Sequence, residues 1–385
     1  MAEVPGSSVA SFAKSPATNR FSMLQRRHLL LKLLTITLIS SCLPIPAGTT
    51  VEPPTPGPPA DPAVPASSPD GPWSRYAAPA SGMYIGWFGK PNSVNGGGFA
   101  EIFSGGSNSD TNTANRPAMI NATLDWVHAR FGRQMGLIHM YEDAGDRADF
   151  PLTVASELAR RRQLLMVSLS FGKTTAAELA DGAGDLQWRN WARGAKAWGR
   201  PVILRWGWEA PVQPWARDAA AYKAAWQRMW RIIKTDVGAG NVQLAFTPVY
   251  FATGWGTYQD YFPGDAYVDW VGVDDFQPPG KGFEDSFEPA YDWFAHHAPG
   301  KPFMVAEWGM KYATDNGVTT YEMPDPDWYA RTLDAARTHG NIKAYVLYDN
   351  DQEIRSALSP TWAGMATLKR KLLDVFYLPQ PTERL

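Results

Sequence analysis

The chain has 385 residues and a formal net charge of −2, so its charge gives no support for nucleic acid as a partner. Hydrophobic residues at 44% and charged residues at 19% are typical of a soluble globular protein with a sizeable core. The single cysteine excludes an internal disulfide framework and a cysteine-rich metal site. The 17 tryptophans exceed what a core usually needs, and indole faces stack well on sugar rings, although we expect most of them to pack inside.

The segment 1–42 has the pattern of an export signal. Arg26 and Arg27 precede a mainly apolar run at 29–39, which is too short to span a bilayer. The run leads into Ile39-Ser40-Ser41-Cys42, which resembles the cleavage site of bacterial lipoproteins. We therefore expect an exported protein that is either secreted or held in the bacterial cell envelope, with the membrane as a partner through a lipid on Cys42. The pattern leaves the Sec and twin-arginine routes open.

The segment 43–77 is rich in proline, with 11 prolines between Pro44 and Pro72. Proline spaced by Ala, Gly, Ser and Thr cannot bury a core and favours an extended chain. We expect a disordered linker here and a single globular domain at 78–385.

Within that domain, short apolar runs alternate with longer amphipathic segments, which is typical of βα units around a parallel sheet. Strands are expected at 83–87, 136–141, 164–170, 201–205, 242–247, 270–273, 303–306 and 344–347. Helices are expected at 187–198, 219–233, 287–297, 327–338 and 362–375, among others. Eight such units favour an α/β fold of the (β/α)8 (TIM) barrel type over an open doubly wound sheet, because no glycine-rich phosphate loop follows the first strand.

Two glutamates follow apolar strands of this expected barrel. Glu209 lies beyond the fourth strand, and Glu307 directly follows the seventh. Chemistry in such barrels takes place at the carboxyl ends of the strands, and glycosidic bond cleavage needs one carboxylic acid and one carboxylate. A distance of about 5 Å between the two carboxyl groups would indicate a retaining reaction, and a distance of about 6.5 to 9.5 Å would indicate an inverting one. For either glutamate alone, a surface position at the start of a loop is about equally expected.

Five segments add a resemblance to a known family. They are similar to glycoside hydrolase family 26, the β-mannanase type, and they comprise 179–209, 241–248, 261–276, 301–309 and 342–345. The similarity covers most of 82–377. It implies a (β/α)8 barrel and a retaining mechanism, with Glu209 as the general acid/base and Glu307 as the nucleophile.

The sequence departs from the family pattern at two places. Trp208 stands where the family usually has His before the acid/base, and Ala210-Pro211-Val212 follows instead of Met-Asn-Gly. Asp275-Phe276 stands where the family has Gly-Tyr, so the tyrosine hydroxyl that would hydrogen-bond the nucleophile is missing. Both changes weaken the inference that the substrate is β-1,4-mannan.

The leading hypothesis is therefore an endo-β-glycanase acting on a polysaccharide, with mannan as the family default. A bacterial exopolysaccharide, β-glucan or xylan is the main alternative substrate. A transglycosylase and a non-catalytic polysaccharide-binding lipoprotein are further alternatives.

Other side chains near the expected strand ends are candidates for sugar contacts. The substrate-binding candidates are Arg205, Trp208, Trp215, Trp255, Asp275, Phe276 and Trp308. A structural ion pair for Arg205 and core packing for the tryptophans are the competing interpretations. Secondary candidates are Glu142, Asp143, Tyr258, Asp260, Tyr261, Asp265, Asp274 and Asp349. No metal is expected, because His296 and His297 have no third ligand at a suitable spacing. No cofactor is expected either, and we expect a monomer.

Overall fold

The computed structural model describes residues 78–90, 116–277, 281–283, 285–310, 325–350, 358 and 361–378. All of them belong to one compact unit, Ala63–Leu385. The predicted export segment with Cys42, and the predicted linker at 43–77, lie outside the described residues. Among the described helices, none combines the length and the apolar character that a membrane span requires.

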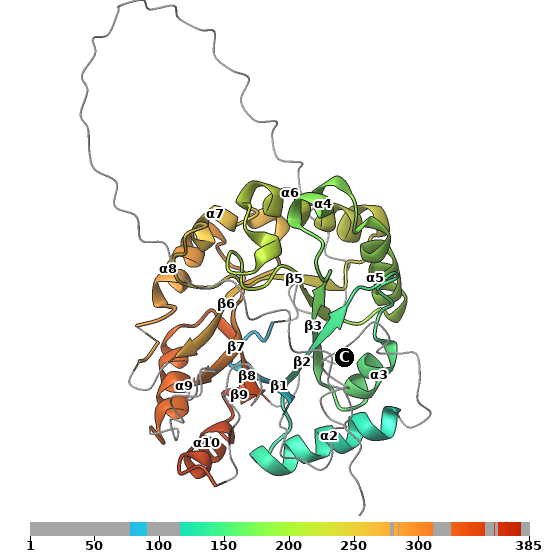
Figure 1. Ribbon diagram of the computed structural model, residues 1–385. Helices are drawn as coiled ribbons and strands as arrows, with labels where there is room; N and C mark the ends of the chain where they lie inside the picture. The colour runs from blue at the N-terminus through green and yellow to red at the C-terminus, as the bar shows by residue number, and fades with distance from the viewer. Residues whose placement is uncertain are drawn as a thin grey trace, which may run out of the picture. The chain divides into compact units, whose positions relative to one another are not determined.

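Eight parallel strands form a closed barrel, with the helices on its outside (Figure 1). The ring closes because β1 pairs with β2 on one side and with β8 on the other. The strands are β1 (Met83–Lys90), β2 (Leu137–Asp143), β3 (Leu164–Ser170), β4 (Val202–Arg205), β5 (Val242–Phe246), β6 (Trp270–Gln277), β7 (Phe303–Met310) and β8 (Ile342–Asn350). A short β9 (Tyr377–Leu378) pairs with the start of β1. All eight predicted strands and the (β/α)8 fold are confirmed.

The described helices cover the outer face of the barrel. They are α2 (Arg116–Phe131), α3 (Leu152–Arg160), α4 (Ala176–Asp181), α5 (Asp185–Trp198), α6 (Ala219–Trp230), α7 (Tyr258–Tyr261), α8 (Glu288–His297), α9 (Trp328–Thr338) and α10 (Met365–Leu372). The five predicted helices are present. The one predicted at 219–233 begins at Ala219 and is capped by Asp218, whose side chain accepts from Ala220 N and Ala221 N. It continues as a π-helix at Arg231–Val237.

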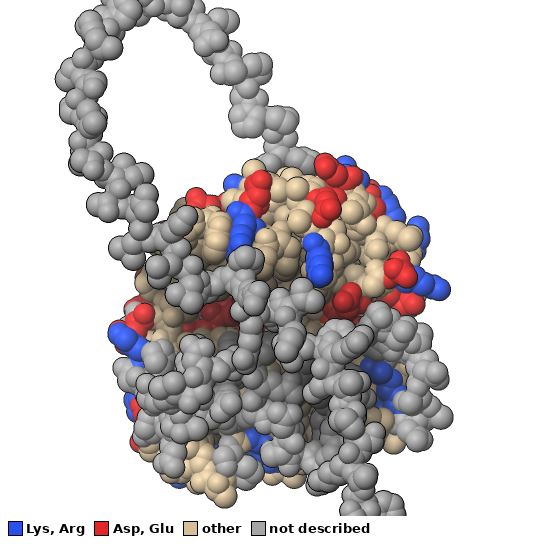
Figure 2. Space-filling view, in the orientation of Figure 1, with Lys and Arg blue, Asp and Glu red and all other residues tan. Residues whose placement is uncertain are grey.

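Side chains inside the barrel change character along the strands. The amino-terminal part is filled by an apolar layer that includes Leu137, Met166, Ile203, Met304 and Val346. Further along the same strands, the inward-facing side chains become polar. The barrel is therefore apolar at the amino-terminal ends of its strands and charged at their carboxyl ends, which form its mouth. A larger apolar layer lies between the sheet and the helices. The visible face of the described surface carries acidic and basic side chains interspersed (Figure 2).

Candidate active site

Glu209 is held where the chain turns out of β4. Gly207 has φ 72° and Glu209 has φ 56°, so both adopt left-handed backbone conformations, which are unusual for a glutamate. The turn is fixed by Glu209 N, which donates to Thr247 O at 3.0 Å. Gln213 Nε2 donates to the carboxylate at 2.7 Å. A half-buried glutamate in a strained conformation beside a barrel mouth is typical of a functional position.

Glu307 faces the barrel interior because β7 contains a bulge. In the pairing with β6, Val305 is opposite Val273 but Glu307 is opposite Asp274, which leaves Ala306 as an extra residue. Before the bulge, Met304 and Ala306 point inward, whereas after it Trp308 packs in the outer apolar layer. Without the extra residue, strict alternation would turn Glu307 toward the helices. The bulge therefore aims this carboxylate at the mouth.

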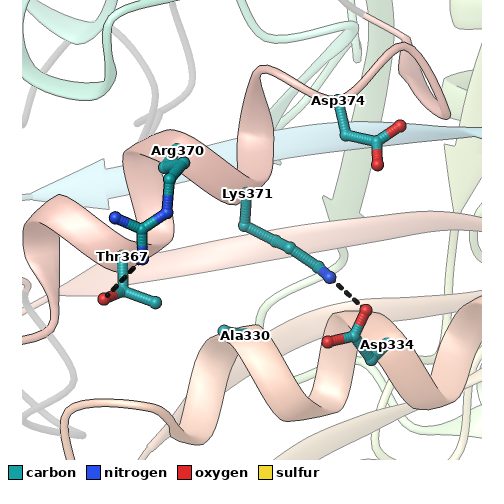
Figure 3. Close-up of a pocket in the computed structure, with 6 residues that line it drawn as sticks. All are labelled: Ala330, Asp334, Thr367, Arg370, Lys371 and Asp374. Atoms are coloured by element: carbon teal, nitrogen blue, oxygen red, sulfur yellow. Dashed lines mark hydrogen bonds and ion pairs between the residues drawn. The ribbon is translucent and has the colours of Figure 1, made fainter.

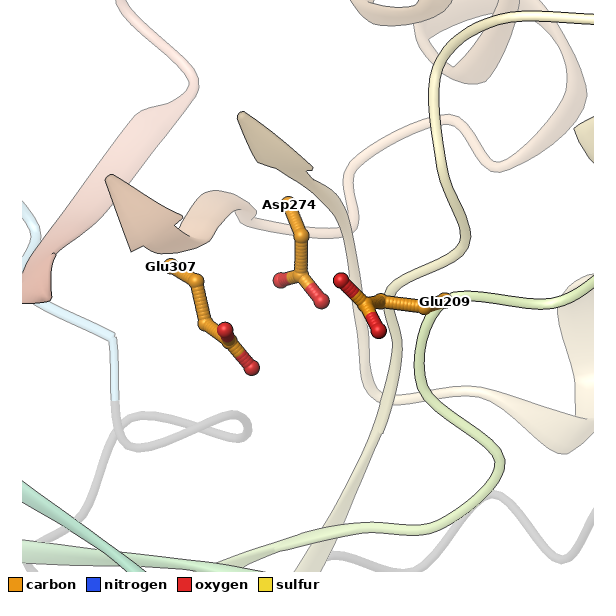
Figure 4. Close-up of side chains that lie close together, drawn as sticks. All are labelled: Glu209, Asp274 and Glu307. Carbon is orange, nitrogen blue, oxygen red and sulfur yellow. The ribbon is translucent and has the colours of Figure 1, made fainter. Parts of the chain in front are cut away.

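The two predicted carboxylates meet, and Asp274 of β6 joins them (Figure 4). One carboxylate oxygen from each of Glu209, Asp274 and Glu307 lies within 4.8 Å of the other two. An oxygen-to-oxygen approach within this limit agrees with the carboxyl spacing of about 5 to 5.5 Å in retaining glycosidases and is closer than the about 6.5 to 9.5 Å of inverting ones. Glu307 and Asp274 are buried, with 3% of each residue exposed, whereas Glu209 is half-buried.

Arg205 neutralises this acidic cluster from within the barrel. Its guanidinium is fully buried and forms ion pairs with Asp274 and with Glu307, the latter at 2.6 Å. It also donates to Ser168 Oγ at 3.1 Å and to Thr247 Oγ1 at 2.7 Å. Burial opposes the charge of Arg205, but Asp274 and Glu307 outweigh it and raise the pKa of the guanidinium, which therefore stays protonated.

The pKa of Asp274 differs from that of an ordinary aspartate. Burial raises the pKa of Asp274 well above its usual range, and the charges of Glu307 and Glu209 add to this effect against the opposing charge of Arg205. Three carboxyl groups around one guanidinium favour a shared proton among them. Since Arg205 already supplies the positive charge at this point, the arrangement suits proton transfer better than it suits binding a metal ion.

The tyrosine Tyr141, at the end of β2, also reaches the cluster. Its hydroxyl donates to Glu307 Oε1, the same oxygen that accepts from Arg205. Below it, His139 Nε2 lies 2.7 Å from Ser168 Oγ, and burial lowers the pKa of His139 well below its usual range. Tyr141 is not among the residues predicted from the sequence. Its position two residues after His139, on the same face of a strand ending at the mouth, was the available signal.

Four of the aromatic and basic candidates lie at or near the mouth. Trp208 is half-buried and contacts Tyr141 with ring centroids 5.4 Å apart, and it lies 6.3 Å from Trp215. The Arg205 guanidinium lies 5.7 Å from the centre of the Trp208 ring. Phe276 is half-buried and packs edge-on against Tyr348 of β8 at 5.1 Å.

Trp255 is 47% exposed on the loop after β5, and Arg217 stacks on its ring at 4.0 Å. Phe251, on the same loop, is 46% exposed. Phe251, and the part of Trp255 that Arg217 leaves uncovered, are therefore accessible to a ligand.

Two of the substrate-binding candidates point away from the mouth. Because β6 extends to Gln277, Asp275 falls on the opposite face from Asp274 and is buried. Trp308 is fully buried against Trp328 and Tyr329. The expectation that Asp275 and Trp308 contact substrate does not fit these positions.

The secondary candidate Asp349 is a structural residue at the end of β8. It accepts hydrogen bonds from Trp87 Nε1, Arg130 and the backbone N of Leu358. A separate polar pocket lies between α9 and α10 and contains none of the predicted site residues (Figure 3). It is lined by Ala330, Asp334, Thr367, Arg370, Lys371 and Asp374.

Comparison with known proteins gives distant similarities. No protein-family model matches the chain. Endoglucanase H of Acetivibrio thermocellus is 25% identical over 241 residues, which is 58% of this chain and 26% of that protein. The chain thus spans about a quarter of the length of this curated relative.

Solved structures of mannanases share the fold. A modular endo-β-1,4-mannanase of Cellulomonas fimi has a TM-score of 0.52 at 16% identity. The match covers 77% of this chain and 72% of the mannanase chain. The catalytic domain of a family 26 endo-β-1,4-mannanase from Bacillus sp. JAMB-750 has a TM-score of 0.50 at 13% identity and covers 79% and 89%. The chain therefore has the (β/α)8 fold of family 26 mannanases.

Proposed function

We propose that this protein is a retaining glycoside hydrolase that cleaves internal bonds of a β-linked polysaccharide. The proposal rests on one observation: a carboxylate oxygen of Glu209 and one of Glu307 lie within 4.8 Å of each other at the mouth of the barrel. Endoglucanase and mannanase names among the similar proteins support an endo-acting β-glycanase.

The proposed reaction has two displacements. Glu307, fixed by Tyr141 and Arg205, attacks the anomeric carbon while Glu209 gives its proton to the leaving glycosidic oxygen. A covalent ester between Glu307 and the sugar results. Glu209, now a carboxylate, takes a proton from water, and the water oxygen attacks the same carbon. The ester bond breaks, and Glu307 recovers its negative charge beside the guanidinium.

The proposed substrate is a β-1,4-mannan type of polymer. The shared fold with mannanases supports this choice, and the exposed faces of Trp255 and Phe251 near the mouth suit stacking along a long glycan. Trp208 and Phe276 alter the surroundings of the reacting sugar, so a bacterial exopolysaccharide, β-glucan or xylan is the alternative. We also propose export with a lipid anchor at Cys42, which mass spectrometry of the mature amino terminus tests.

The test is the release of reducing ends from mannan, xylan, mixed-linkage glucan and a bacterial exopolysaccharide. Glu209→Ala and Glu307→Ala should each lower the rate by roughly 10³-fold or more. With an activated aryl glycoside, azide should restore turnover in both variants and give glycosyl azides of opposite anomeric configuration.

Asp275→Asn is the matched control, since it changes a carboxylate on the outer face of β6. Circular dichroism checks that each variant is folded. Wild-type rates in both glutamate variants would reject the assignment. Binding of a glycan by the wild-type protein without any turnover would indicate a binding protein instead.

A further inference from the structure

The nucleophile proposed above has an unusual hydrogen-bond donor. Tyr141 comes from β2, whereas Glu307 is on β7, and β1 and β8 lie between these strands in the ring. The tyrosine hydroxyl thus reaches Glu307 Oε1 across part of the barrel mouth rather than from a neighbouring strand. Arg205 donates to the same oxygen from a third direction.

The ring of Tyr141 is held in place from several sides. It contacts Phe88 at 4.9 Å, His139 at 4.6 Å and Trp208 at 5.4 Å between ring centroids. Desolvation, followed by the charge of Glu307, raises the pKa of Tyr141 well above its ordinary value of 10. The phenol therefore keeps its proton and serves as a donor to the carboxylate.

The resemblance to glycoside hydrolase family 26 implies a tyrosine at position 276 whose hydroxyl would hydrogen-bond the nucleophile, and this chain has Phe276 there. Phe276 packs on Tyr348 at 5.1 Å, Tyr348 packs on Phe88 at 5.0 Å, and Phe88 packs on Tyr141. The four rings form a continuous arc around the mouth. Phe276 and Tyr141 are its two ends, and only the Tyr141 end carries a hydroxyl to Glu307.

We propose that Tyr141 supplies from β2 the hydroxyl that positions the nucleophile Glu307, in place of a hydroxyl at position 276. This inference rests on the proposed function. In the free enzyme, the phenol donates to one carboxylate oxygen and leaves the other to attack the sugar. In the covalent intermediate the carboxyl group is a neutral ester and accepts a weaker hydrogen bond.

The hydrogen bond from Tyr141 affects the two chemical steps of the proposed reaction differently. When water breaks the ester, negative charge returns to the Glu307 carboxyl, and the bond from Tyr141 strengthens as the transition state forms. Loss of the hydroxyl therefore slows breakdown of the intermediate more than its formation. A hydrogen bond to a charged group is large enough to change that rate by roughly 10- to 100-fold.

The experiment compares Tyr141→Phe with the wild-type protein on an activated aryl β-glycoside. We expect kcat to fall by roughly 10- to 100-fold, KM to fall with it, and a covalent glycosyl-enzyme to accumulate in intact-protein mass spectra. The double variant Tyr141→Phe/Phe276→Tyr should recover part of kcat and lose the accumulation. The matched control is Tyr377→Phe, which removes a buried hydroxyl that donates to Leu333 O at 3.1 Å, and it should leave kcat and KM unchanged.

The outcomes separate this inference from the proposed function. If Tyr141→Phe keeps kcat within twofold and shows no intermediate while Glu307→Ala is inactive, Tyr141 does not position the nucleophile and the function stands. If Tyr141→Phe slows the reaction but the double variant recovers nothing, the exchange with position 276 is wrong. If Glu307→Ala turns over normally, the proposed function itself is wrong.

Discussion

Asp275 provides a pH-dependent test of the division between the inner and outer faces of β6. Its carboxyl group is buried behind the strand and accepts a hydrogen bond from Gln277, whose Nε2 also donates to Tyr250 Oη at 2.9 Å. Burial raises the pKa of Asp275 from an ordinary 3.8 to about 7, although Gln277 and Ser286 form hydrogen bonds with it. The folded protein therefore prefers a neutral carboxyl group at this position.

The sign of the effect follows from proton binding. Between pH 4 and pH 7 the unfolded chain has lost the proton of Asp275 and the folded protein still holds it, so stability falls as pH rises. A pKa of about 7 in place of 3.8 corresponds to a loss of roughly 4 kcal/mol in the free energy of unfolding, complete above pH 7. Asn has the shape of the neutral acid and cannot ionise. Asp275→Asn should therefore match the wild-type stability at pH 4 and exceed it by roughly 4 kcal/mol at pH 8.

The assay is urea unfolding of both proteins, followed by tryptophan fluorescence at pH 4, 5.5, 7 and 8. The quantity of interest is the difference between variant and wild type at each pH, because other carboxyl groups contribute equally to both. A difference that does not change with pH would refute a neutral buried Asp275. A large loss of kcat/KM in the variant would refute its placement away from substrate.

Three further predictions concern the support of the site. Gln213→Leu removes the donor to the Glu209 carboxylate and should lower kcat/KM roughly tenfold, measured on the polysaccharide, and an unchanged value would mean that substrate alone orients Glu209. Thr247→Val leaves the buried Nε of Arg205 without this acceptor, so urea unfolding should show a loss of about 1 to 3 kcal/mol. Gly272→Ala places a Cβ 2.0 Å from the carbonyl oxygen of Met304, and soluble expression or the unfolding midpoint should drop sharply, whereas wild-type stability would mean that β6 and β7 are less closely packed.

The barrel was predictable because its signal is repeated eight times. Each strand is a short apolar run followed by an amphipathic helix, and closure of the ring then brings the ends of β4 and β7 to one mouth. The proximity of Glu209 and Glu307 followed from that topology. Arg205 was a candidate because it ends the predicted fourth strand, and it points inward because it lies two residues after Ile203, which belongs to the apolar layer inside the barrel.

The positions of Asp275 and Trp308 on the outer face of the sheet have local causes. Strand β6 continues four residues beyond the predicted end at 273, so Asp274 and Asp275 point to opposite faces. In β7, the extra residue Ala306 shifts the alternation, which sends Glu307 inward and Trp308 outward. A bulge depends on the pairing with neighbouring strands and leaves no mark in apolar periodicity. Tyr141 was missed because its partner is 166 positions away in the chain.

In a closed ring of strands, the position of a residue in the sequence does not decide which other residues its side chain meets at the mouth. Every sector delivers its final side chains to a common centre, so the phenol of Tyr141 meets a carboxylate that the chain supplies 166 positions later. Enzymes with this fold can therefore differ in their sequence motifs and still keep the same arrangement of functional atoms. Searches for related catalysts gain by matching the placement of functional atoms in space, independent of the order in which the chain provides them.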